Sequence, residues 1–487
     1  MMRFVRNLLL YIVLFLPAVF WAQADSVWSA TVGSFGHEDL VRMTRDNVGN
    51  VWSVGTTWSD WEKGSQVLIL QSDSMLNCLH GLDWGDEGAQ YGKDILCDDE
   101  NNIWILASGT SNTSLGYDPT IVKFNANAEV ISTLELQIPG WQEVSQLGLH
   151  EQDWLVAGVN WNGDLMQQAG FVLGQVGSNN YQWIELPIAG RDMEAAILEW
   201  DTVASSWMLA YHYWTDVDSL PNTAFFWVDT QGNVQQSITN HPLCKGIEMW
   251  DAVNHNGVWT GAGGYLENGV FRGHLMYWDF NGTLSNAAAF PATPTESILH
   301  SIALKGEGDG YVVAGWTYYF GSGYADAYIH GLDFNMTWLG GGAIGGAQVD
   351  KIYDVQAFSR NTLMMVGENA SQEGGLDAQG WILKFNDDYI TTSDLPIELQ
   401  NMTCLSASLG MPEIQSSQQI VMTQNDQTWF FSTELSSLKL FNLQGQLLEE
   451  HHGRISSLDF GHLPKGMYLI ATGTAQGEST VFKSILD

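Results

Sequence analysis

Acidic side chains recur at nearly regular intervals along the first three quarters of the chain. If the fold gathers these carboxylates around one axis, they would attract a cation and raise each other's pKa. A pair of carboxylates is also what glycoside hydrolysis requires. No two of them stand out as an acid–base pair, and a row of solvated strand edges explains the same pattern, so no catalytic residue is assigned. The recurring acids are Asp39, Asp94, Glu143, Glu194, Asp251 and Asp354.

Aromatic side chains form a second recurring set, in polar stretches that also contain Asn, Asp and Thr. Flat rings beside such groups suit sugars, which stack an apolar face and form hydrogen bonds at their edges. The alternative is that the rings pack between neighbouring units of the fold. The candidate ligand-binding residues are Trp58, Trp61, Trp161, Trp214, Tyr265, Trp316 and Tyr319.

Other motifs for catalysis or metal binding are missing or weak. The sequence has no Gly-x-Ser-x-Gly and no His-Glu-x-x-His. Gly321-Ser322-Gly323 is typical of a loop, and His451-His452 of a solvated turn. The acidic stretch Asp98–Asn102 lacks the spacing of a calcium loop and favours a capped β-turn. We expect no metal and no other cofactor; Ca²⁺ in this loop or among the recurring acids is the open alternative.

The elements that would position these residues follow from a repeat. A short apolar phrase, clearest in Trp104-Ile105-Leu106-Ala107-Ser108, recurs with starts at residues 52, 104, 154, 207, 259, 311 and 363. A fixed period of this length is typical of a repeat architecture. Each unit contains four short strands. In the second unit these are Lys93–Cys97, Ile103–Ala107, Thr120–Phe124 and Glu129–Leu136.

Seven units of four strands predict an all-β protein with a seven-bladed β-propeller over residues 25–392. No unit contains a long segment of helical periodicity, which excludes a helical solenoid. In a propeller the first strands line the axial channel, and the loops after the second strands gather on one face. We expect Val27–Val32 to pair as the outer strand of the last unit and close the ring, with Tyr389–Thr392 as the alternative.

Composition limits the partners. The 487 residues include 18 Lys and Arg against 55 Asp and Glu, a formal net charge of −37, which excludes nucleic acid and anionic lipid as partners. The four cysteines, Cys78, Cys97, Cys244 and Cys404, are too few for a disulfide scaffold. Cys78 could pair with Cys97 between neighbouring units, but buried free thiols are the favoured interpretation.

The N-terminus has the features of a secretory signal peptide. Arg3 and Arg6 precede an apolar run from Leu8 to Trp21, and Ala22-Gln23-Ala24 follows as a small-x-small cleavage site. We expect a signal peptide over residues 1–24, cleaved after Ala24 or alternatively after Ala22. The apolar run is short for a membrane span, and no other stretch reaches that length, so we expect no transmembrane segment in the mature chain.

The period stops after residue 392. Residues 393–416 contain Pro396 and Pro412 and indicate a linker, and the alternating pattern of residues 417–487 predicts a small antiparallel β-sandwich. From about residue 415 this part resembles the type A C-terminal sorting domain of the type IX secretion system. The resemblance lies in the stretches 438–448, 463–470 and 479–486, while the acidic Asp487 departs from the family's usual ending. Its motif positions are Asn442, Gly445, Leu463, Lys465, Gly466, Tyr468 and Lys483.

The resemblance implies where the protein is transported and does not indicate a reaction. Proteins with this domain are exported by Bacteroidota through the inner and then the outer membrane, which would make the type IX machinery a partner of this chain. The domain is commonly removed, and the cargo is attached to the outer-membrane surface or released. We therefore expect a secreted or cell-surface location.

Three functions stay open for the propeller. A non-catalytic module for adhesion, which binds a glycan or another surface protein, is favoured because the sequence contains no recognisable catalytic set. The alternative is a secreted glycan-degrading hydrolase or lyase with carboxylates at the mouth of the channel. A structural component of a surface layer is the third.

Overall fold

The computed structural model divides the chain into two compact units, Met1–Met411 and Pro412–Asp487. We refer to them as unit 1 and unit 2. Within the described residues, no helix is long and apolar enough to cross a membrane. The structure describes residues 27–33, 36–58, 64–85, 88–110, 117–138, 140–161, 167–215, 220–289, 296–306, 308–318, 324–346, 348–359, 362–371, 378–386, 397–401, 406–410, 422–425, 428–441, 447–459, 463, 466–474 and 479–486. The expected signal peptide and its cleavage site lie outside them.

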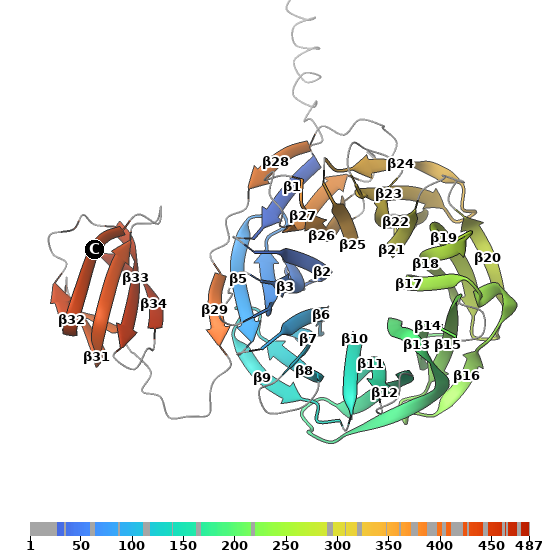
Figure 1. Cartoon of the computed structure of the whole chain (residues 1–487), viewed down its shortest axis with the longest axis horizontal. Coiled ribbons are helices and arrows are strands. Elements are labelled where there is room, and N and C mark those ends of the chain that lie inside the picture. Colours follow the sequence, from blue (N-terminus) through green and yellow to red (C-terminus); the bar gives the residue numbers. More distant parts are fainter. Residues whose placement is uncertain are drawn as a thin grey trace, which may run out of the picture. The chain divides into compact units, whose positions relative to one another are not determined.

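Unit 1 is built from mainly antiparallel β-sheets, several of them four-stranded, that follow one another along the chain (Figure 1). The first two sheets contain β2 (Glu38–Arg45), β3 (Val51–Thr57), β4 (Gln66–Ser72) and β5 (Cys78–Gly85), then β6 (Gln90–Cys97), β7 (Ile103–Thr110), β8 (Tyr117–Phe124) and β9 (Val130–Glu135). A seven-stranded sheet follows, with β10 (Trp141–His150), β11 (Asp153–Trp161), β12 (Gln167–Gln175), β13 (Tyr181–Asp201), β14 (Ser206–Trp214), β15 (Pro221–Val228) and β16 (Val234–Ile238).

The 3₁₀ helix η1 (Pro242–Cys244) leads into the remaining sheets of unit 1. One contains β17 (Ile247–His255), β18 (Val258–Glu267), β19 (Val270–Asp279) and β20 (Leu284–Ala289). The next contains β21 (Ser297–Leu304), β22 (Gly310–Thr317), β23 (Asp326–Asp333) and β24 (Trp338–Ile344). The last combines β25 (Asp350–Ser359), β26 (Thr362–Asn369) and β27 (Gln379–Asn386) with β1 (Val27–Val32) and β28 (Ile397–Asn401).

The sheets of unit 1 surround a central axis in chain order, with the first strand of each sheet nearest the axis (Figure 1). The long strand β13 belongs to two neighbouring sheets. Up to Gly190 it pairs with β12, and from Arg191 onward it pairs with β14. It is therefore the outer strand of one sheet and the inner strand of the next. This all-β, propeller-like arrangement agrees with the repeat in the sequence.

The tryptophan that opens many copies of the repeat holds its sheet together. Strands β3 and β14, which contain it, are buried along nearly their whole length because sheets cover both faces. The indole N–H of Trp52 donates to Asp46 at 3.3 Å, and that of Trp104 donates to Asp98 at 2.8 Å. In these two copies the repeat phrase combines a buried apolar strand with a hydrogen bond for the one polar group of its largest ring, whereas the buried indole N–H of Trp207 on β14 has no hydrogen-bond partner in the structure.

Acids and amides at strand ends cap the turns that follow them. Asp98 accepts the backbone N–H groups of Glu100 at 3.0 Å and Asn102 at 2.7 Å. The Asp98 carboxylate also forms an ion pair with the Lys123 ammonium group at 3.1 Å. Asp73, Asn125, Asp229 and Asp333 accept backbone N–H groups two and four residues further on in the same way. The stretch Asp98–Asn102 therefore has the geometry of the capped β-turn that the sequence favours.

The N-terminal strand pairs with the last sheet of unit 1 as predicted, but β28 and not β1 is the outermost strand of that sheet. β1 pairs antiparallel with β27, with Trp28 opposite Lys384 and Val32 opposite Gly380. The alternative segment Tyr389–Thr392 lies outside the described residues. The residues expected to form a linker contribute two further strands: β28 runs parallel to β1, and β29 (Ser406–Gly410) runs parallel to β5. Part of that expected linker therefore belongs to the sheets of unit 1.

The cysteines differ from the expectation. Cys78, at the start of β5, is disulfide-bonded, whereas Cys97 and Cys244 are free. Cys78 therefore does not pair with Cys97, and Cys78 is not a free thiol. Burial raises the pKa of the Cys97 thiol to about 11 and that of Cys244 to about 12, so both free thiols are protonated and unreactive.

Unit 2 contains five described strands in one hydrogen-bonded sheet. They are β30 (Met422–Asn425), β31 (Thr428–Phe441), β32 (Leu447–Asp459), β33 (Gly466–Thr474) and β34 (Ser479–Leu486). The long β31 pairs with β30, β32 and β33 and so connects these strands, and the small β-sandwich over residues 417–487 stays a prediction. Of the motif positions, Gly466 and Tyr468 lie on β33 and Lys483 on β34. Leu463 precedes β33. Asn442, Gly445 and Lys465 lie outside the described residues.

Candidate functional site

A β-bulge recurs on the axial strand of every sheet in unit 1. In β2 the register shifts between Leu40 and Arg42, which leaves Val41 as the extra residue, and the other axial strands shift at the equivalent place. A bulge re-aims the side chain of the extra residue. Every one of these side chains lines a single pocket on the axis: Val41, Lys93, Ser145, Ala196, Trp250, His300 and Tyr353.

This pocket, which we call the aromatic pocket, has a volume of about 270 Å³. Three bulge residues on successive sheets form one wall. The ring centroids of Trp250 and His300 lie 4.9 Å apart, and those of His300 and Tyr353 lie 5.5 Å apart. The bulge residues of the other sheets are smaller or flexible, which leaves room beside this wall. Tyr91 also lines the pocket.

Charged groups of both signs line the aromatic pocket: Asp39, Glu194, Arg42 and Lys93. Asp39 accepts the backbone N–H of Thr56 at 2.8 Å. Burial raises the pKa of Asp39 to about 6, because this hydrogen bond offsets only part of the desolvation. Glu194 lies 3.6 Å from the imidazole of His212. The Lys93 ammonium lies 5.9 Å from the ring centroid of Tyr91.

His300 is a neutral imidazole in this wall. Burial and the nearby charges of Lys351 and Arg42 lower the pKa of His300 to about 3. Its ring can therefore accept a hydrogen bond at one nitrogen and donate at the other. It adds no charge to the pocket in the neutral pH range.

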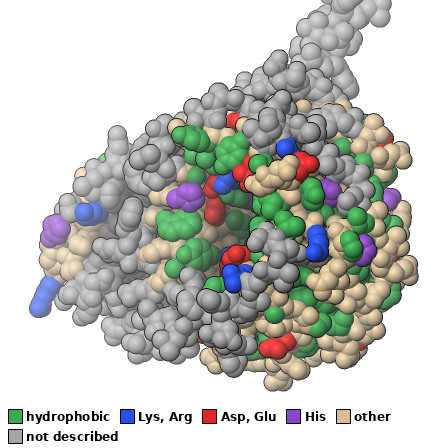
Figure 2. Space-filling model, turned by 45° about the vertical axis from the view of Figure 1, so that its right-hand side comes forward, with side chains coloured by type: hydrophobic (Ala, Val, Ile, Leu, Met, Phe, Trp, Pro, Cys, Tyr) green, Lys and Arg blue, Asp and Glu red, His purple; other side chains and the backbone are tan. Residues whose placement is uncertain are grey.

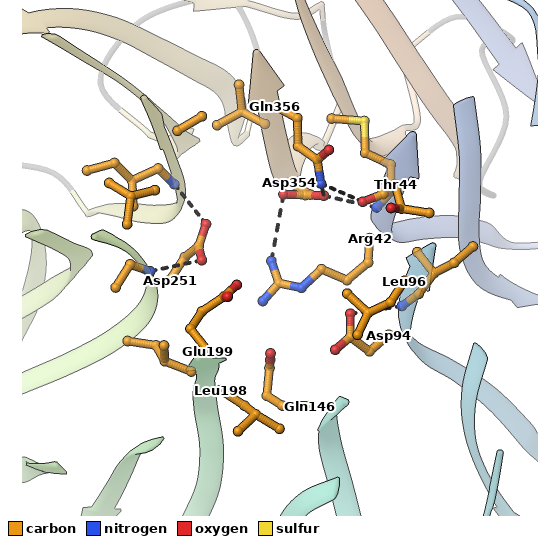
Figure 3. A pocket seen from close by; sticks show the side chains of 18 of the residues that line it. Arg42, Thr44, Asp94, Leu96, Gln146, Leu198, Glu199, Asp251, Asp354 and Gln356 are labelled. Atoms are coloured by element: carbon orange, nitrogen blue, oxygen red, sulfur yellow. Dashed lines mark hydrogen bonds and ion pairs between the residues drawn. The ribbon is translucent and has the colours of Figure 1, made fainter. Parts of the chain in front are cut away.

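A second cavity of about 330 Å³, the carboxylate pocket, adjoins the first. Arg42 and Gln146 line both cavities. Asp94, Glu199, Asp251 and Asp354 contribute carboxyl groups, and Arg42 extends among them (Figure 3). The space-filling view shows a hollow in unit 1 with hydrophobic, acidic and basic side chains around it (Figure 2).

Three aspartates of the carboxylate pocket connect neighbouring sheets. Each follows a bulge residue and accepts a backbone N–H from the axial strand of the next sheet. Asp94 accepts from Leu147 at 2.7 Å, and Asp251 accepts from Ile302 at 2.9 Å. Asp354 accepts from Met43 at 2.9 Å and so links β25 back to β2. Much of the hydrogen-bonding capacity of these carboxylates is therefore used in holding the ring of sheets together.

The carboxylates outnumber the cations on this axis. Arg42 lies 3.9 Å from Asp354 and is the only Lys or Arg among the described residues that line the carboxylate pocket. Burial raises the pKa of Asp94 to about 6, although Arg42 opposes the shift. Burial and the negative charges of Asp251 and Asp94 raise the pKa of Glu199 to about 8. Glu199 therefore exchanges its proton close to neutral pH.

The recurring acids do converge on the axis, in two groups. Asp39 and Glu194 line the aromatic pocket, and Asp94, Asp251 and Asp354 line the carboxylate pocket. Glu143 is exposed and interacts electrostatically with Lys93 and Glu194. In the described part of the chain, no three His, Cys, Asp or Glu residues are arranged to hold a metal ion.

The predicted aromatic residues lie around the aromatic pocket rather than in it. Trp58 lies 6.1 Å from the ring of Tyr91, and Trp316 lies 5.9 Å from the Lys351 ammonium. The indole of Trp214 donates to Glu248 at 3.2 Å. Trp161 and Tyr265 are exposed, at the end of β11 and on β18. Trp61 and Tyr319 lie outside the described residues.

Sequence reasoning missed the residues that line the pockets most directly. These are Arg42, Tyr91, Glu199, Trp250, His300 and Tyr353. The signal was present, because the bulge residues are spaced by the same period as the repeat phrase. A prediction that assumes strict alternation along a strand places the bulge residue on the wrong face of the sheet. The aromatic bulge residues were therefore not predicted to line a pocket.

Comparisons with known proteins assign no family to this chain. No protein-family model matches the chain, and no curated protein matches it. Among solved structures, a Dyadobacter fermentans protein of unknown function is 10% identical, with a TM-score of 0.39 over 73% of this chain and 98% of that one. A prolyl endopeptidase is 11% identical, with a TM-score of 0.46 over 93% and 54% of the two chains. A Fusarium graminearum α-L-arabinofuranosidase is 11% identical, with a TM-score of 0.35 over 61% and 92%. Likenesses at this level carry no activity to this chain.

Proposed function

We propose that this chain is a secreted or cell-surface, seven-bladed β-propeller protein that binds a glycan, or another surface protein, without catalysis. The observation that carries the proposal is the aromatic pocket on the axis. Its wall of Trp250, His300 and Tyr353 stands beside hydrogen-bonding and charged groups. One bulge residue from each of seven axial strands lines it, which supports the count of seven blades.

The pocket matches the chemistry of a sugar ring. The flat faces of Trp250 and Tyr353 can stack on the apolar C–H face of a pyranose. His300, Lys93 and Asp39 supply acceptors and donors for its hydroxyl groups. A cavity of about 270 Å³ accommodates about one ring, so the pocket would take the end of a glycan chain.

A role without catalysis follows from how the carboxylates are used. Asp94, Asp251 and Asp354 accept backbone N–H groups of neighbouring strands and are not free to transfer protons. The alternative is a glycan hydrolase or lyase. The raised pKa of Asp39, in the same pocket as Glu194, favours that alternative because a general acid needs a proton at neutral pH.

The secreted location is part of the proposal. The signal-peptide features of residues 1–24 and the sorting motifs of residues 438–486 support export by the type IX machinery of a member of the Bacteroidota. The disulfide at Cys78 adds support, because disulfides persist in oxidising compartments. Intact mass spectrometry of the protein from the cell surface and medium tests this. Export predicts a species that begins near Asp25 and ends before about residue 415.

Binding and catalysis are separated by one experiment on the mature chain. We would identify a glycan ligand on an array, measure its Kd by calorimetry, and analyse the same mixture for cleavage products by mass spectrometry. Trp250→Ala should weaken binding about ten-fold or more, since an aromatic contact of this kind contributes on the order of 1–2 kcal/mol. Val203→Ala, an exposed apolar site outside both pockets, is the control.

The outcomes are distinct. Binding that depends on Trp250 and leaves the glycan intact supports the proposal. Cleavage that Asp39→Asn abolishes would replace it with the hydrolase or lyase. Binding that Trp250→Ala leaves unchanged would place the ligand elsewhere, for example on the exposed Trp161 and Tyr265.

A further inference from the structure

We infer that the ligand of the aromatic pocket carries a protonated amine, so that amino-sugar ends are preferred over neutral or N-acetylated ones. The inference rests on the proposed function and names the class of ligand. It follows from the balance of charge along the axis, the rings that surround the pocket, and the way the carboxylates are already used.

The axis lacks positive charge. Six carboxyl groups line the two adjoining cavities, from Asp39, Asp94, Glu194, Glu199, Asp251 and Asp354, whereas the cations are Arg42 and Lys93. The chain as a whole carries a formal charge of −37, so its long-range field also attracts cations. The aromatic pocket alone has two groups of each sign, so the excess of carboxyl groups lies in the adjoining carboxylate pocket. A positively charged ligand would reduce that excess along the axis as a whole, and a neutral ligand would not.

The raised pKa values of carboxyl groups in both cavities agree with this shortage of positive charge. The pKa values of Asp39 and Asp94 are raised to about 6, and that of Glu199 to about 8. Burial is the largest cause in each, and neighbouring carboxylates add to it. Burial favours the protonated form of these groups, and Arg42 offsets the shift only in part for Asp94 and Glu199. A bound amine would supply further counter-charge.

The rings around the pocket already hold ammonium groups of the chain itself. Lys93 lies 5.9 Å from the ring centroid of Tyr91, and Lys351 lies 6.0 Å from that of Tyr353. These are distances at which the face of an aromatic ring attracts a cation. Trp250 makes no such contact with a described Lys or Arg, and tryptophan is the ring that attracts cations best. Trp250 packs against the rings of His212 at 4.6 Å and His300 at 4.9 Å, and as a residue that lines the pocket it can add a cation contact with a ligand's amine.

The carboxylates suit an amine better than a metal ion. Four of the six, Asp39, Asp94, Asp251 and Asp354, receive backbone N–H groups, which leaves fewer oxygens to surround an ion such as Ca²⁺. Asp39 and Glu194 line the aromatic pocket itself. An ammonium group needs only three acceptors, and a ring face can replace one of them.

The test uses two probes with the same sugar backbone, one with free protonated amines and one with neutral acetylated amines. We would measure the Kd of the full mature chain for a β-1,4-linked glucosamine hexamer and for its fully N-acetylated counterpart, at pH 6 and low salt. The expected result is binding about ten-fold tighter for the free amine, from ring attraction and charge together. High salt should reduce the difference, because it screens the charges.

Variants distinguish the effect of losing charge in the pocket from the effect of disturbing the fold. Asp39→Asn combined with Glu194→Gln should remove most of the preference, since both amides keep the shape and lose the charge. Glu135→Gln, at an exposed position on β9, is the matched control and should keep it. In a further experiment CaCl₂ is added as a competitor. Displacement of the amine by millimolar Ca²⁺ would point to a metal site instead.

Different results would contradict the amine preference and the proposed glycan binding. If both hexamers bind equally and Trp250→Ala weakens both, the amine preference is wrong and the glycan-binding proposal stands. If the N-acetylated hexamer binds more tightly, the inference is also wrong. If neither hexamer binds, both the inference and its glycan class are wrong.

Discussion

Arg42 is the residue on which the charges of the axis depend most. It is the only described Lys or Arg that lines the carboxylate pocket, and Asp94, Asp251, Asp354 and Glu199 surround it (Figure 3). An arginine suits this place because its planar group carries five donors and keeps its charge. A hydrophobic residue of the same length would leave the carboxylates facing one another without compensation.

Arg42→Met should therefore destabilise unit 1 on the order of 2 kcal/mol at pH 8, because it removes one partner of a partly buried ion pair. The loss should be smaller at pH 5, where Asp94 and Glu199, with pKa values near 6 and 8, hold protons and repel each other less. Denaturant unfolding at both pH values measures this. Equal losses at pH 5 and pH 8 would contradict the charge explanation.

Asp326 shows how a buried carboxyl without a partner affects stability. Its side chain is 1% exposed, and its Oδ1 atom has no hydrogen-bond partner in the structure. Burial and the nearby Asp350 raise the pKa of Asp326 to about 6. Because the folded pKa is above the unfolded one, this group lowers stability as pH rises from about 4 to 6, and the loss persists above pH 6.

Asp326→Asn should accordingly stabilise the protein at pH 8, on the order of 2 kcal/mol, and have little effect at pH 4. The melting temperature of the variant and of the unchanged protein, measured across this range, tests the sign. Asp153→Asn, at a half-buried aspartate at the start of β11, is the control variant. A stabilisation at pH 4 that equals the one at pH 8 would show that the proton is not involved.

At the scale of elements, closure of the ring depends on β1. This strand covers the edge of β27, and the Ser29 hydroxyl accepts the indole N–H of the buried Trp381 at 2.7 Å. β1 lies between β27 and β28 in this sheet, so without β1 the edge of β27 would be left unpaired. The strands at the two ends of unit 1 therefore stabilise each other.

A chain that begins at residue 34 should unfold at a clearly lower temperature than one that begins at residue 25, and it should aggregate through the exposed edge. A milder variant, Ser29→Ala, should cost about 1 kcal/mol, since it leaves a buried indole N–H unpaired. Thermal unfolding with light scattering records both effects. Identical melting temperatures for the two chain lengths would mean that β28 can take the place of β1.

The sequence allowed much of this fold to be predicted, for a physical reason. Buried strands such as Trp104 to Ser108 read as continuous apolar runs, and turn-capping acids such as Asp229 mark their ends, so both signals are local. The pairing of Val27–Val32 with the last unit could be predicted because the repeat was one strand short there. The bulges could not be predicted from alternation alone, so Trp250, His300 and Tyr353 were missed. The long strand β13, shared by two sheets, also has no local signal.

At the scale of the whole molecule, a disulfide bond constrains unit 1. Cys78 at the start of β5 is disulfide-bonded, and β29, near the end of the unit, runs parallel to β5 with Ser406 opposite Gly81. The chain has four cysteines, of which Cys97 and Cys244 are free and Cys404 lies outside the described residues, so we predict that Cys404 is the partner of Cys78. Such a bond closes a loop of most of the unit and restricts the unfolded chain.

Peptide mapping of the mature protein without reduction should therefore find Cys78 linked to Cys404, and Cys97 and Cys244 should react with an alkylating reagent only after unfolding. Reduction should lower the melting temperature, because closing so long a loop stabilises by about 4 kcal/mol in the chain-entropy account. Cys97→Ser is the control and should leave both the map and the reduction effect unchanged. Four reactive thiols in protein taken from the cell surface would contradict the bond and would also weaken the case for an oxidising compartment.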